Sequence, residues 1–455
     1  MSVVANYHKG EAFPFQLLIF LFTHNYLNTL EKAESRDWIM STLSALLNYI
    51  FIIITILQCN SVFYRAGNHL GKIQLLWMAL LALIFLRSVA GIYLSKMDIT
   101  KLLIYELFFS MVMLALLIAE YQMTSISKGV VVLYFLAPFM LIVVFYQASR
   151  LGNTDYLFIA YKNVVLALAV VSLLFWLLSM LKLPTNMNTP VLWGSYRQLP
   201  GYFGIHYIAQ GQTVFLGLSM IRNTGLFVEA PMYSYVLSIA LMVLLFVDKR
   251  VGSKKNLEVL ILLFAIFTTT STTGIIVALL AVMYDLLIVR NKASMLFKTI
   301  IVLAGVLIVG LIIRIVLLRK IQVEGVGSSS VRWNDIQSGF YAWRNHLWLG
   351  NGFGNYDVIE AYMSPNRLVM NGNSGFSSGL MEVLAYGGVL TAMFQIVPTF
   401  LALFRSKRLF GLAAISFLLF VFTIVNDVYI YIMLLSYFWV MVIFRSTNNG
   451  SECLE

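Results

Sequence analysis

Residues 328–378 read SSSVRWNDIQSGFYAWRNHLWLGNGFGNYDVIEAYMSPNRLVMNGNSGFSS, and this segment decides how the chain is organised. It is a long polar interruption in a mostly apolar sequence. The apolar run Thr299–Leu318 precedes it, and three further apolar stretches follow it. A chain that is otherwise suited to hydrocarbon therefore builds an aqueous segment here, and we expect any chemistry to take place in this segment.

The composition is that of a membrane protein with many spans. Hydrophobic residues make up 60% of the 455 residues and charged residues 11%, and the mean hydropathy is +0.86. No water-soluble domain can bury so large an apolar share at a realistic ratio of surface to volume. The net charge of +11 comes largely from Lys and Arg in short loops between apolar runs, which is typical of membrane orientation and not of nucleic-acid binding. The two isolated cysteines exclude a disulfide framework.

Apolar blocks of about 20 residues are long enough to cross the hydrocarbon core of a bilayer. The predicted fold is therefore an all-α polytopic membrane protein with about twelve transmembrane helices. A shorter block at 13–28 is either a thirteenth span or an interfacial helix, and we favour the interfacial helix. The first apolar stretch has no basic start and no cleavage signal, so we expect no removable signal peptide. The predicted spans lie near 37–58, 73–94, 99–120, 128–148, 158–181, 231–247, 255–269, 272–290, 295–318, 376–404, 409–425 and 428–445.

Clusters of Lys and Arg predict the orientation of the chain. They lie at 249–255, 290–298, 405–408 and 445. Counting spans places all of them on one face, which the positive-inside rule makes cytoplasmic. Both termini are then inside, and two long polar loops are outside. The expected regions are N-terminal spans in 1–181, a first outer loop in 182–230, central spans in 231–318, a large outer loop with amphipathic helices in 319–375, and C-terminal spans with a short tail in 376–455.

The sequence R-N-T-G-L-F-V-E-A-P at 222–231 forms the first candidate site. Pro231 suits the first turn of the following helix, whose free backbone N–H groups favour an anion. Arg222 lies just upstream and adds positive charge. Glu229 is interpreted either as a capping carboxylate or partner of Arg222, or as a catalytic group. A hydroxyl-rich stretch, TTTSTTG at 268–274, either caps helix ends in a tight hairpin or hydrogen-bonds a sugar.

A helix over Val331–Leu347 is the second candidate site. At 100° per residue, one face of about 80° combines a cation, a carboxylate, an aromatic surface and an imidazole. Arginine suits phosphate because its planar fork binds two oxygens, and a carboxylate or imidazole can accept a hydroxyl proton. The alternative is an amphipathic helix whose tryptophans anchor it at the membrane surface. The residues of this face are Arg332, Asp335, Gly339, Trp343 and His346.

A glycine-rich segment and the ionisable residues within apolar blocks are two further candidate features. The sequence GNGFGN at 350–355 follows no strand and lacks the lysine of a phosphate-binding loop, so it is interpreted as a tight turn and not as a nucleotide site. Ionisable residues within apolar blocks are costly and usually functional, although the long arginine side chains can also reach the membrane surface. These residues are Arg87, Glu106, Arg314, Glu382 and Asp427.

Taken together, the motifs of the second half resemble the O-antigen polymerase and ligase superfamily. The matching pieces are the segments 222–231 and 268–274, R-W-N-D with W-L-G-N-G-F-G-N-Y in 332–356, and N-S-G-F-S-S-G-L-M-E-V-L-A-Y-G-G in 373–388. These enzymes are multi-span glycosyltransferases of a GT-C-like class that act on undecaprenyl-diphosphate-linked sugars at the outer face of the bacterial plasma membrane. Many relatives have a histidine near Asn373, and this chain has none there, which favours a polymerase over a ligase.

The resemblance implies a reaction and roles for individual residues. A growing glycan would move from its lipid diphosphate to a sugar hydroxyl of a new lipid-linked repeat unit of capsule, exopolysaccharide or O-antigen, without a metal or other cofactor. Arg222 and Arg332 would bind the diphosphate, with Arg314 or Arg344 as further candidates. Trp343 and Asn373 would contact the sugars. Asp335 is the first candidate for the base, Glu229 the second and His346 the third.

Other functions remain open at this point. A ligase of the same superfamily differs only in its acceptor. A lipid-linked sugar flippase or polysaccharide exporter would also have many spans and buried charges, but it needs a cationic cavity that is reachable from both sides. The expected partners are undecaprenyl-diphosphate-linked oligosaccharides and membrane lipid, with a chain-length regulator and a flippase as possible protein partners.

Overall fold

The computed structural model describes residues 35–67, 69–121, 132–193, 195–215, 217–290, 328–365, 367, 375–423 and 429–444, and the single residues 294, 299, 303 and 310. The block 13–28, most of the block 295–318, Arg314, Asn373 and Asp427 lie outside the described residues.

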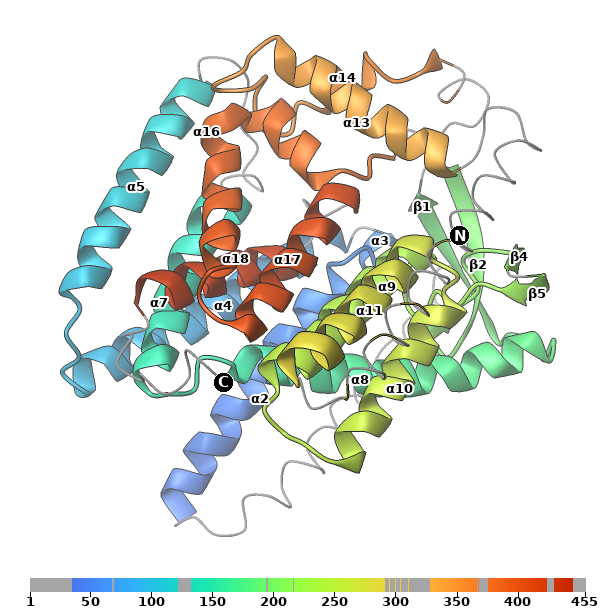
Figure 1. Cartoon of the computed structure of the whole chain (residues 1–455), viewed down its shortest axis with the longest axis horizontal. Helices are drawn as coiled ribbons and strands as arrows, with labels where there is room; N and C mark the ends of the chain where they lie inside the picture. The colour runs from blue at the N-terminus through green and yellow to red at the C-terminus, as the bar shows by residue number, and fades with distance from the viewer. Residues whose placement is uncertain are drawn as a thin grey trace, which may run out of the picture.

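Helices form most of the described chain, and they coincide with the predicted apolar blocks to within a few residues. In Figure 1 the helices α13 and α14 lie across the top of the helical body, and α5 stands at its edge. The helices are α2 (Ser35–Leu57), α3 (Val62–Arg65), α4 (Leu70–Leu94), α5 (Thr100–Tyr121), η1 (Val132–Leu136) with α7 (Ala137–Arg150), α8 (Tyr156–Met180), α9 (Ala230–Met242) with η2 (Val243–Val247), α10 (Ser253–Thr268), α11 (Thr272–Tyr284) with η3 (Asp285–Val289), α13 (Ser328–Arg344), α14 (Tyr356–Glu360), α16 (Gly379–Ala402), α17 (Lys407–Phe422) and α18 (Tyr429–Ile443).

Seven helical stretches among these residues are long and apolar enough to cross a membrane. Shorter apolar helices occur at Thr42–Leu57 and Tyr429–Ile443. The prediction of a polytopic membrane protein is confirmed, whereas about twelve spans remain a prediction.

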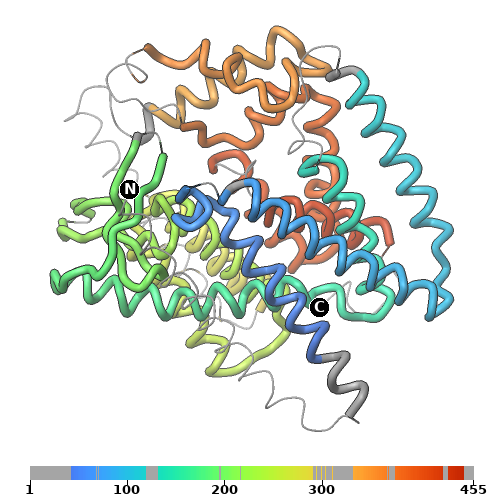
Figure 2. The backbone as a smooth tube through the Cα atoms, turned by 180° about the vertical axis from the view of Figure 1, so that it is seen from behind, coloured from blue at the N-terminus to red at the C-terminus, as the bar shows by residue number. Residues whose placement is uncertain are grey.

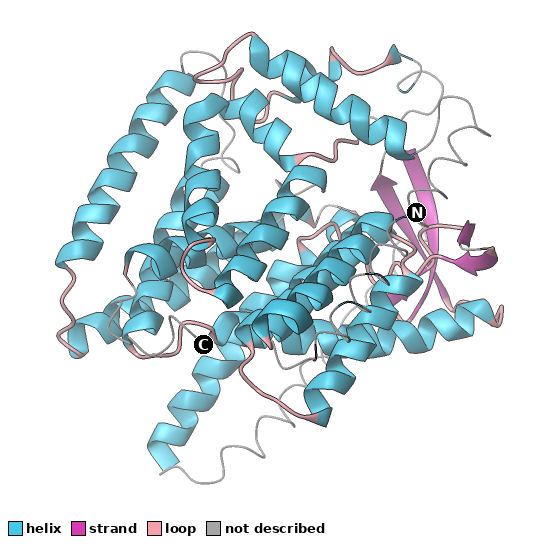
Figure 3. Ribbon diagram, viewed as in Figure 1, coloured by secondary structure: helices cyan, strands magenta, loops and turns pink. Residues whose placement is uncertain are grey.

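The prediction of an all-α fold is wrong for the first polar loop. This loop forms a three-stranded antiparallel sheet in the order β1-β2-β3 and a separate β4-β5 hairpin, which lie together beside α9 and α10 (Figure 3). Val191 and Leu199 point into a small apolar cluster that also contains Val62 and Val228, so the sheet gains a buried face against neighbouring segments. The strands are β1 (Met187–Trp193), β2 (Ser195–Tyr202), β3 (His206–Tyr207), β4 (Gln212–Phe215) and β5 (Leu218–Ile221).

The helix α16 is broken at Gly388, which has φ +62° and ψ −166°. Backbone groups freed by the break are paired by the turn that follows α13. The N–H groups of Asn351 and Gly352 donate to Ala385 O (2.8 Å) and Tyr386 O (2.9 Å), and on the other side of the break Val389 N–H donates to Leu347 O (2.9 Å). Irregular backbone inside a membrane protein is tolerated where such protein partners exist. The turn 347–352 is therefore fixed onto a membrane helix.

Three of the basic clusters lie on one side of the protein. Lys255 interacts electrostatically with Arg290 and Arg408, and the Tyr284 hydroxyl donates to Lys407 O at 2.9 Å. The loops before α10, after η3 and before α17 are therefore neighbours, as the span count predicts. In the view from behind, α8 crosses this part of the molecule (Figure 2). That this side is cytoplasmic remains a prediction.

We expect Gly388→Ala to lower the free energy of unfolding by about 2 kcal/mol or more, because the positive φ is strained for any residue with a Cβ and an added Cβ would overlap the Trp348 carbonyl. Thermal unfolding of the purified protein in nanodiscs measures this. Gly71→Ala is the matched control, since no atom lies within 4 Å of a Cβ added at Gly71. Equal melting temperatures for the two variants would contradict the account of the helix break.

Candidate functional site

The hydroxyl-rich turn between α10 and α11 is the base of the candidate site. The Thr268 hydroxyl donates to Ala265 O at 2.8 Å and the Thr269 hydroxyl donates to Ile266 O at 2.6 Å. Both carbonyl groups lie in the last turn of α10, where the usual helical donors run out, and Ile266 O also accepts from the Thr269 N–H at 3.1 Å. Of the two interpretations of this stretch, the structure shows the capped hairpin. Its remaining carbonyl and hydroxyl groups are free to bind other segments.

The segment that carries Arg222 binds this turn. Arg222 Nε donates to Thr269 O at 3.1 Å, and Asn223 contacts Thr268 twice, through its N–H to the carbonyl (3.0 Å) and its side-chain amide to the hydroxyl (3.0 Å). Gly225 follows with φ +54°, and a Cβ added there would lie 3.1 Å from the Tyr233 ring. The R-N-T-G sequence therefore holds one arginine at a defined place above the α10–α11 turn.

Arg332, near the start of α13, binds the same turn from the other side. Its Nη1 donates to Thr273 Oγ1 at 2.6 Å and to Phe422 O, at the end of α17, at 2.9 Å. Burial lowers the pKa of both arginines, and the charge of Arg332 lowers the pKa of Arg222 further. The structure thus brings together two like charges that are 110 positions apart in the sequence.

Neither arginine belongs to an ion pair within the part of the chain that the structure describes. The ion pairs found there involve other cations, namely Lys162, Arg250, Arg290 and Arg367. The charge of Glu229 raises the pKa of Arg222, although burial has the larger and opposite effect. Two neighbouring guanidinium groups, neither of them in an ion pair with a carboxylate, can bind an anion with several oxygens. A phosphate or diphosphate is such an anion.

Glu229 precedes α9 in extended conformation, with φ −146° and ψ 145°, and its side chain makes no capping hydrogen bond. Instead, Trp193 Nε1 donates to Glu229 Oε1 at 2.5 Å. The capping interpretation is therefore wrong, and the structure shows an electrostatic interaction with Arg222 without a direct ion pair. Glu229 is half-buried, so one carboxylate oxygen is held by the indole while the group keeps partial access to solvent.

Trp193 and Arg65 complete this side of the site, and neither belongs to a motif that stands out in the sequence. Trp193 ends β1, next to the hairpin turn, and the guanidinium carbon of Arg65 lies 4.8 Å from the centre of its ring. Arg65 Nε also donates to Asn60 Oδ1 at 2.7 Å. Residues 187–202 do not alternate regularly between apolar and polar types, so the period-2 pattern of a half-buried strand gave no signal for Trp193.

Asp335, the first candidate for the base, is completely buried between α13 and the start of α16. Arg367 Nη1 lies 2.6 Å from its Oδ1, and its Oδ2 accepts hydrogen bonds from the Ser377 N–H (3.0 Å) and the Ser377 hydroxyl. Burial raises the pKa of Asp335 despite these partners. The carboxylate links α13 to two other segments, and this arrangement favours a positioning role.

The face of α13 predicted to bear the site packs against α16. A Cβ added at Gly339 would lie 2.6 Å from Met381 Cβ, and Trp343 is partly buried with its Nε1 donating to Leu347 O at 2.9 Å. The helix ends at Arg344, so the prediction that it continues to Leu347 is wrong, and His346 lies in the next turn. Arg344 and His346 are exposed at the opposite end of α13 from Arg332.

Among the described residues, no group of three or more His, Cys, Asp or Glu side chains lies close enough to hold a metal ion. The residues that the structure brings together at one place are Arg222 and Arg332, with Glu229, Trp193 and Arg65 beside Arg222.

Comparison with known proteins covers the central part of the chain. Residues 257–396 match the family described as O-Antigen ligase. The matched segment contains the α10–α11 turn, Arg332 and the broken part of α16, whereas Arg222 and Glu229 precede it. No curated protein matches the chain. This match bears out the resemblance of residues 257–396 to the O-antigen polymerase and ligase superfamily.

Proposed function

We propose that the protein is a polysaccharide polymerase that joins undecaprenyl-diphosphate-linked oligosaccharide repeat units at the outer face of the bacterial plasma membrane. The observation that carries this proposal is the pair of arginines, Arg222 and Arg332, bound to one turn without a carboxylate partner. A diphosphate is the anion that leaves in this reaction, and preorganised cations stabilise the charge that develops on it.

In the proposed reaction, the bond between the anomeric carbon of the growing glycan and the diphosphate oxygen breaks, and the diphosphate keeps the electron pair. A hydroxyl oxygen of the acceptor repeat unit forms the new bond to that carbon. The hydroxyl proton passes to a base. Arg222 and Arg332 bind the departing diphosphate, so the protein supplies positive charge where negative charge accumulates.

We propose Glu229 as the base. It is half-buried and lies near Arg222, and its hydrogen bond to Trp193 fixes one carboxylate oxygen. Asp335 was the first candidate from the sequence, but both of its oxygens are bound within the protein. In this proposal Asp335 holds α13, and hence Arg332, in place. His346 lies beyond the far end of α13 from Arg332.

A ligase of the same superfamily remains the second candidate, because the matched family is described as O-Antigen ligase. The absence of a histidine beside Asn373 supports the polymerase. A flippase is less well supported, since both arginines are hydrogen-bonded to neighbouring segments that fix them in place. A chain-length regulator and a flippase are proposed partners of the polymerase.

Replacement of either arginine by lysine tests the diphosphate site. We expect Arg332→Lys and Arg222→Lys each to lower kcat/KM about 100- to 1000-fold, because lysine keeps the charge and loses the planar fork. Chain growth of purified lipid-linked repeat units measures this. Arg197→Lys is the control, since Arg197 is exposed on β2. Activity close to that of the wild type in both site variants would exclude the diphosphate role.

The assignment of the base is tested by Glu229→Gln and Asp335→Asn. Glu229→Gln should bind substrate and lose turnover, because the amide cannot accept the hydroxyl proton. Asp335→Asn should instead destabilise the protein by about 3–5 kcal/mol, because it leaves Arg367 buried without its partner.

The double variant Asp335→Asn/Arg367→Met should recover part of the melting temperature and of the activity, since it removes the unpaired charge. A stably folded Asp335→Asn protein that binds substrate and has no turnover would assign the base to Asp335. The measurements are thermal unfolding, lipid-linked substrate binding and chain growth on the same preparations.

A further inference from the structure

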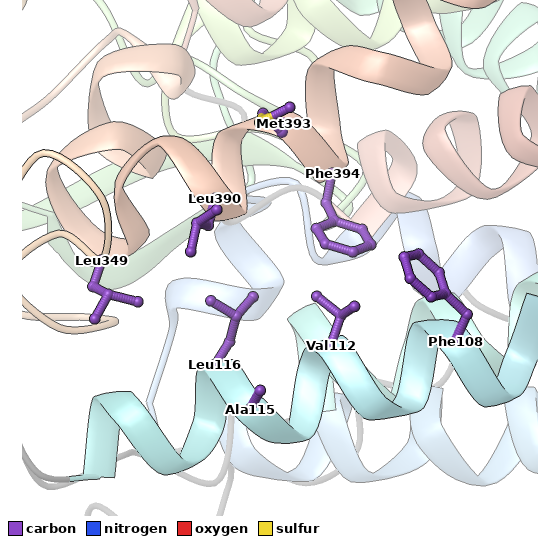
Figure 4. Close-up of a pocket in the computed structure, with 8 residues that line it drawn as sticks. All are labelled: Phe108, Val112, Ala115, Leu116, Leu349, Leu390, Met393 and Phe394. Carbon is purple, nitrogen blue, oxygen red and sulfur yellow. The ribbon is translucent and has the colours of Figure 1, made fainter.

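An apolar crevice lies between α5 and α16, under the far end of α13 from the paired arginines. Its volume is about 340 Å³. Figure 4 shows side chains of α5 and α16 facing one another across it, with Leu349 at one end. The lining residues are Phe108, Val112, Ala115, Leu116, Leu349, Leu390, Met393 and Phe394.

Both walls of the crevice belong to helices that are long and apolar enough to span the membrane, Thr100–Ile118 and Gly379–Ala402. The lining residues Phe108 and Leu116 are eight positions apart, so this wall extends for ~12 Å along α5. The upper end of α5 approaches the layer formed by α13 and α14 (Figure 1). Because both walls are apolar and belong to candidate spans, the ligand that suits this space is a lipid tail.

Leu349, at one end of the crevice, belongs to a turn that also carries basic and aromatic residues. His346 O accepts a hydrogen bond from Gly350 N–H at 2.9 Å, which places His346 and Leu349 in one tight turn. Trp348 in this turn is 67% exposed, as is typical of a residue at the level of lipid headgroups. Arg344 is exposed beside Tyr341 and has no ion pair with any residue that the structure describes. An apolar crevice that ends at a turn preceded by an exposed arginine has the chemistry of an anionic lipid site.

We propose that this crevice binds the polyprenyl tail of the acceptor substrate, with Arg344 and His346 close to its diphosphate. The proposal rests on the proposed function, which requires two lipid diphosphates to be bound at the same time. In the acceptor, the reacting hydroxyl is separated from its own diphosphate by the sugars of the repeat unit. The acceptor diphosphate must therefore lie at a distance from the donor diphosphate.

The length of α13 supplies this distance. Arg332 and Arg344 are twelve positions apart on the same helix, which corresponds to ~18 Å along its axis. An oligosaccharide of a few sugars extended along α13 spans such a gap. Trp333, Phe340 and Tyr341 are exposed along the helix and offer flat apolar surfaces on which sugar rings can pack. One helix would thus separate the donor and acceptor diphosphates.

Photolabelling tests the crevice without requiring turnover. The probe is undecaprenyl diphosphate with a diazirine in its tail, and the protein is the purified full chain in phosphatidylglycerol-containing nanodiscs. We expect labelled peptides from α5 and α16, and we expect Ala115→Trp to lower this labelling about threefold or more. The effect is modest because packing, and not transfer from water, holds a tail that is already in the bilayer. Leu114→Trp is the matched control, since Leu114 is 58% exposed and does not line the crevice.

Two further comparisons identify the ligand. Unlabelled undecaprenyl diphosphate should compete with the probe and additional phosphatidylglycerol should not, and Arg344→Gln/His346→Gln should weaken this competition. In chain-growth assays, Ala115→Trp should raise the KM for an acceptor with a full-length tail and leave unchanged the KM for one with a short tail. Equal competition by phosphatidylglycerol, or labelling unchanged by Ala115→Trp, would overturn the proposed site. If the wild-type protein shows the expected labelling but no chain growth, the polymerase activity would be rejected and the lipid site would stand.

Discussion

A broken membrane helix needs partners for the backbone groups that its break exposes, and α16 obtains them from the turn 347–352. This requirement organises the layer formed by α13 and α14. The close approach excludes side chains at Gly350 and Gly388, where an added Cβ would overlap backbone atoms of the other segment. The W-L-G-N-G and A-Y-G-G motifs, which begin 37 positions apart in the sequence, are thus two halves of one contact. That contact fixes the C-terminal end of α13, while Asp335 and Arg367 fix its middle.

The position of α13 then determines where its charges lie. Arg332 at its start meets the α10–α11 turn, which also holds Arg222. Burial lowers the pKa of Arg222, and the charge of Arg332 lowers it further. Perturbed groups of this kind cluster at functional sites. At the other end of the helix, Arg344 precedes the turn whose Leu349 lines an apolar crevice between α5 and α16. The proposed reaction uses both ends.

The sequence predicted the spans, and it singled out two arginines that the structure brings to one turn. It was less informative about the contacts of single carboxylates. Hydrophobic blocks of about 20 residues are recognisable without tertiary information. The helical face that includes Arg332 and Asp335 was also recognisable, but periodicity shows which residues share a face and not what that face contacts. Asp335 looked like a reactive group because its partners, Arg367 and Ser377, lie 32 and 42 positions away. The β-sheet was missed because its buried face depends on residues such as Val62 and Val228 from other segments.

The most direct test of the account is the chemistry of the leaving group. Purified protein would be incubated with undecaprenyl-diphosphate-linked repeat units in EDTA and without nucleotide, and both the glycan ladder and free undecaprenyl diphosphate would be measured. The account predicts one released diphosphate lipid for each new glycosidic bond, and neither product with an Arg222→Lys/Arg332→Lys protein. Loss of activity in EDTA with rescue by a divalent ion, or chain growth by the double variant at the wild-type rate, would contradict it.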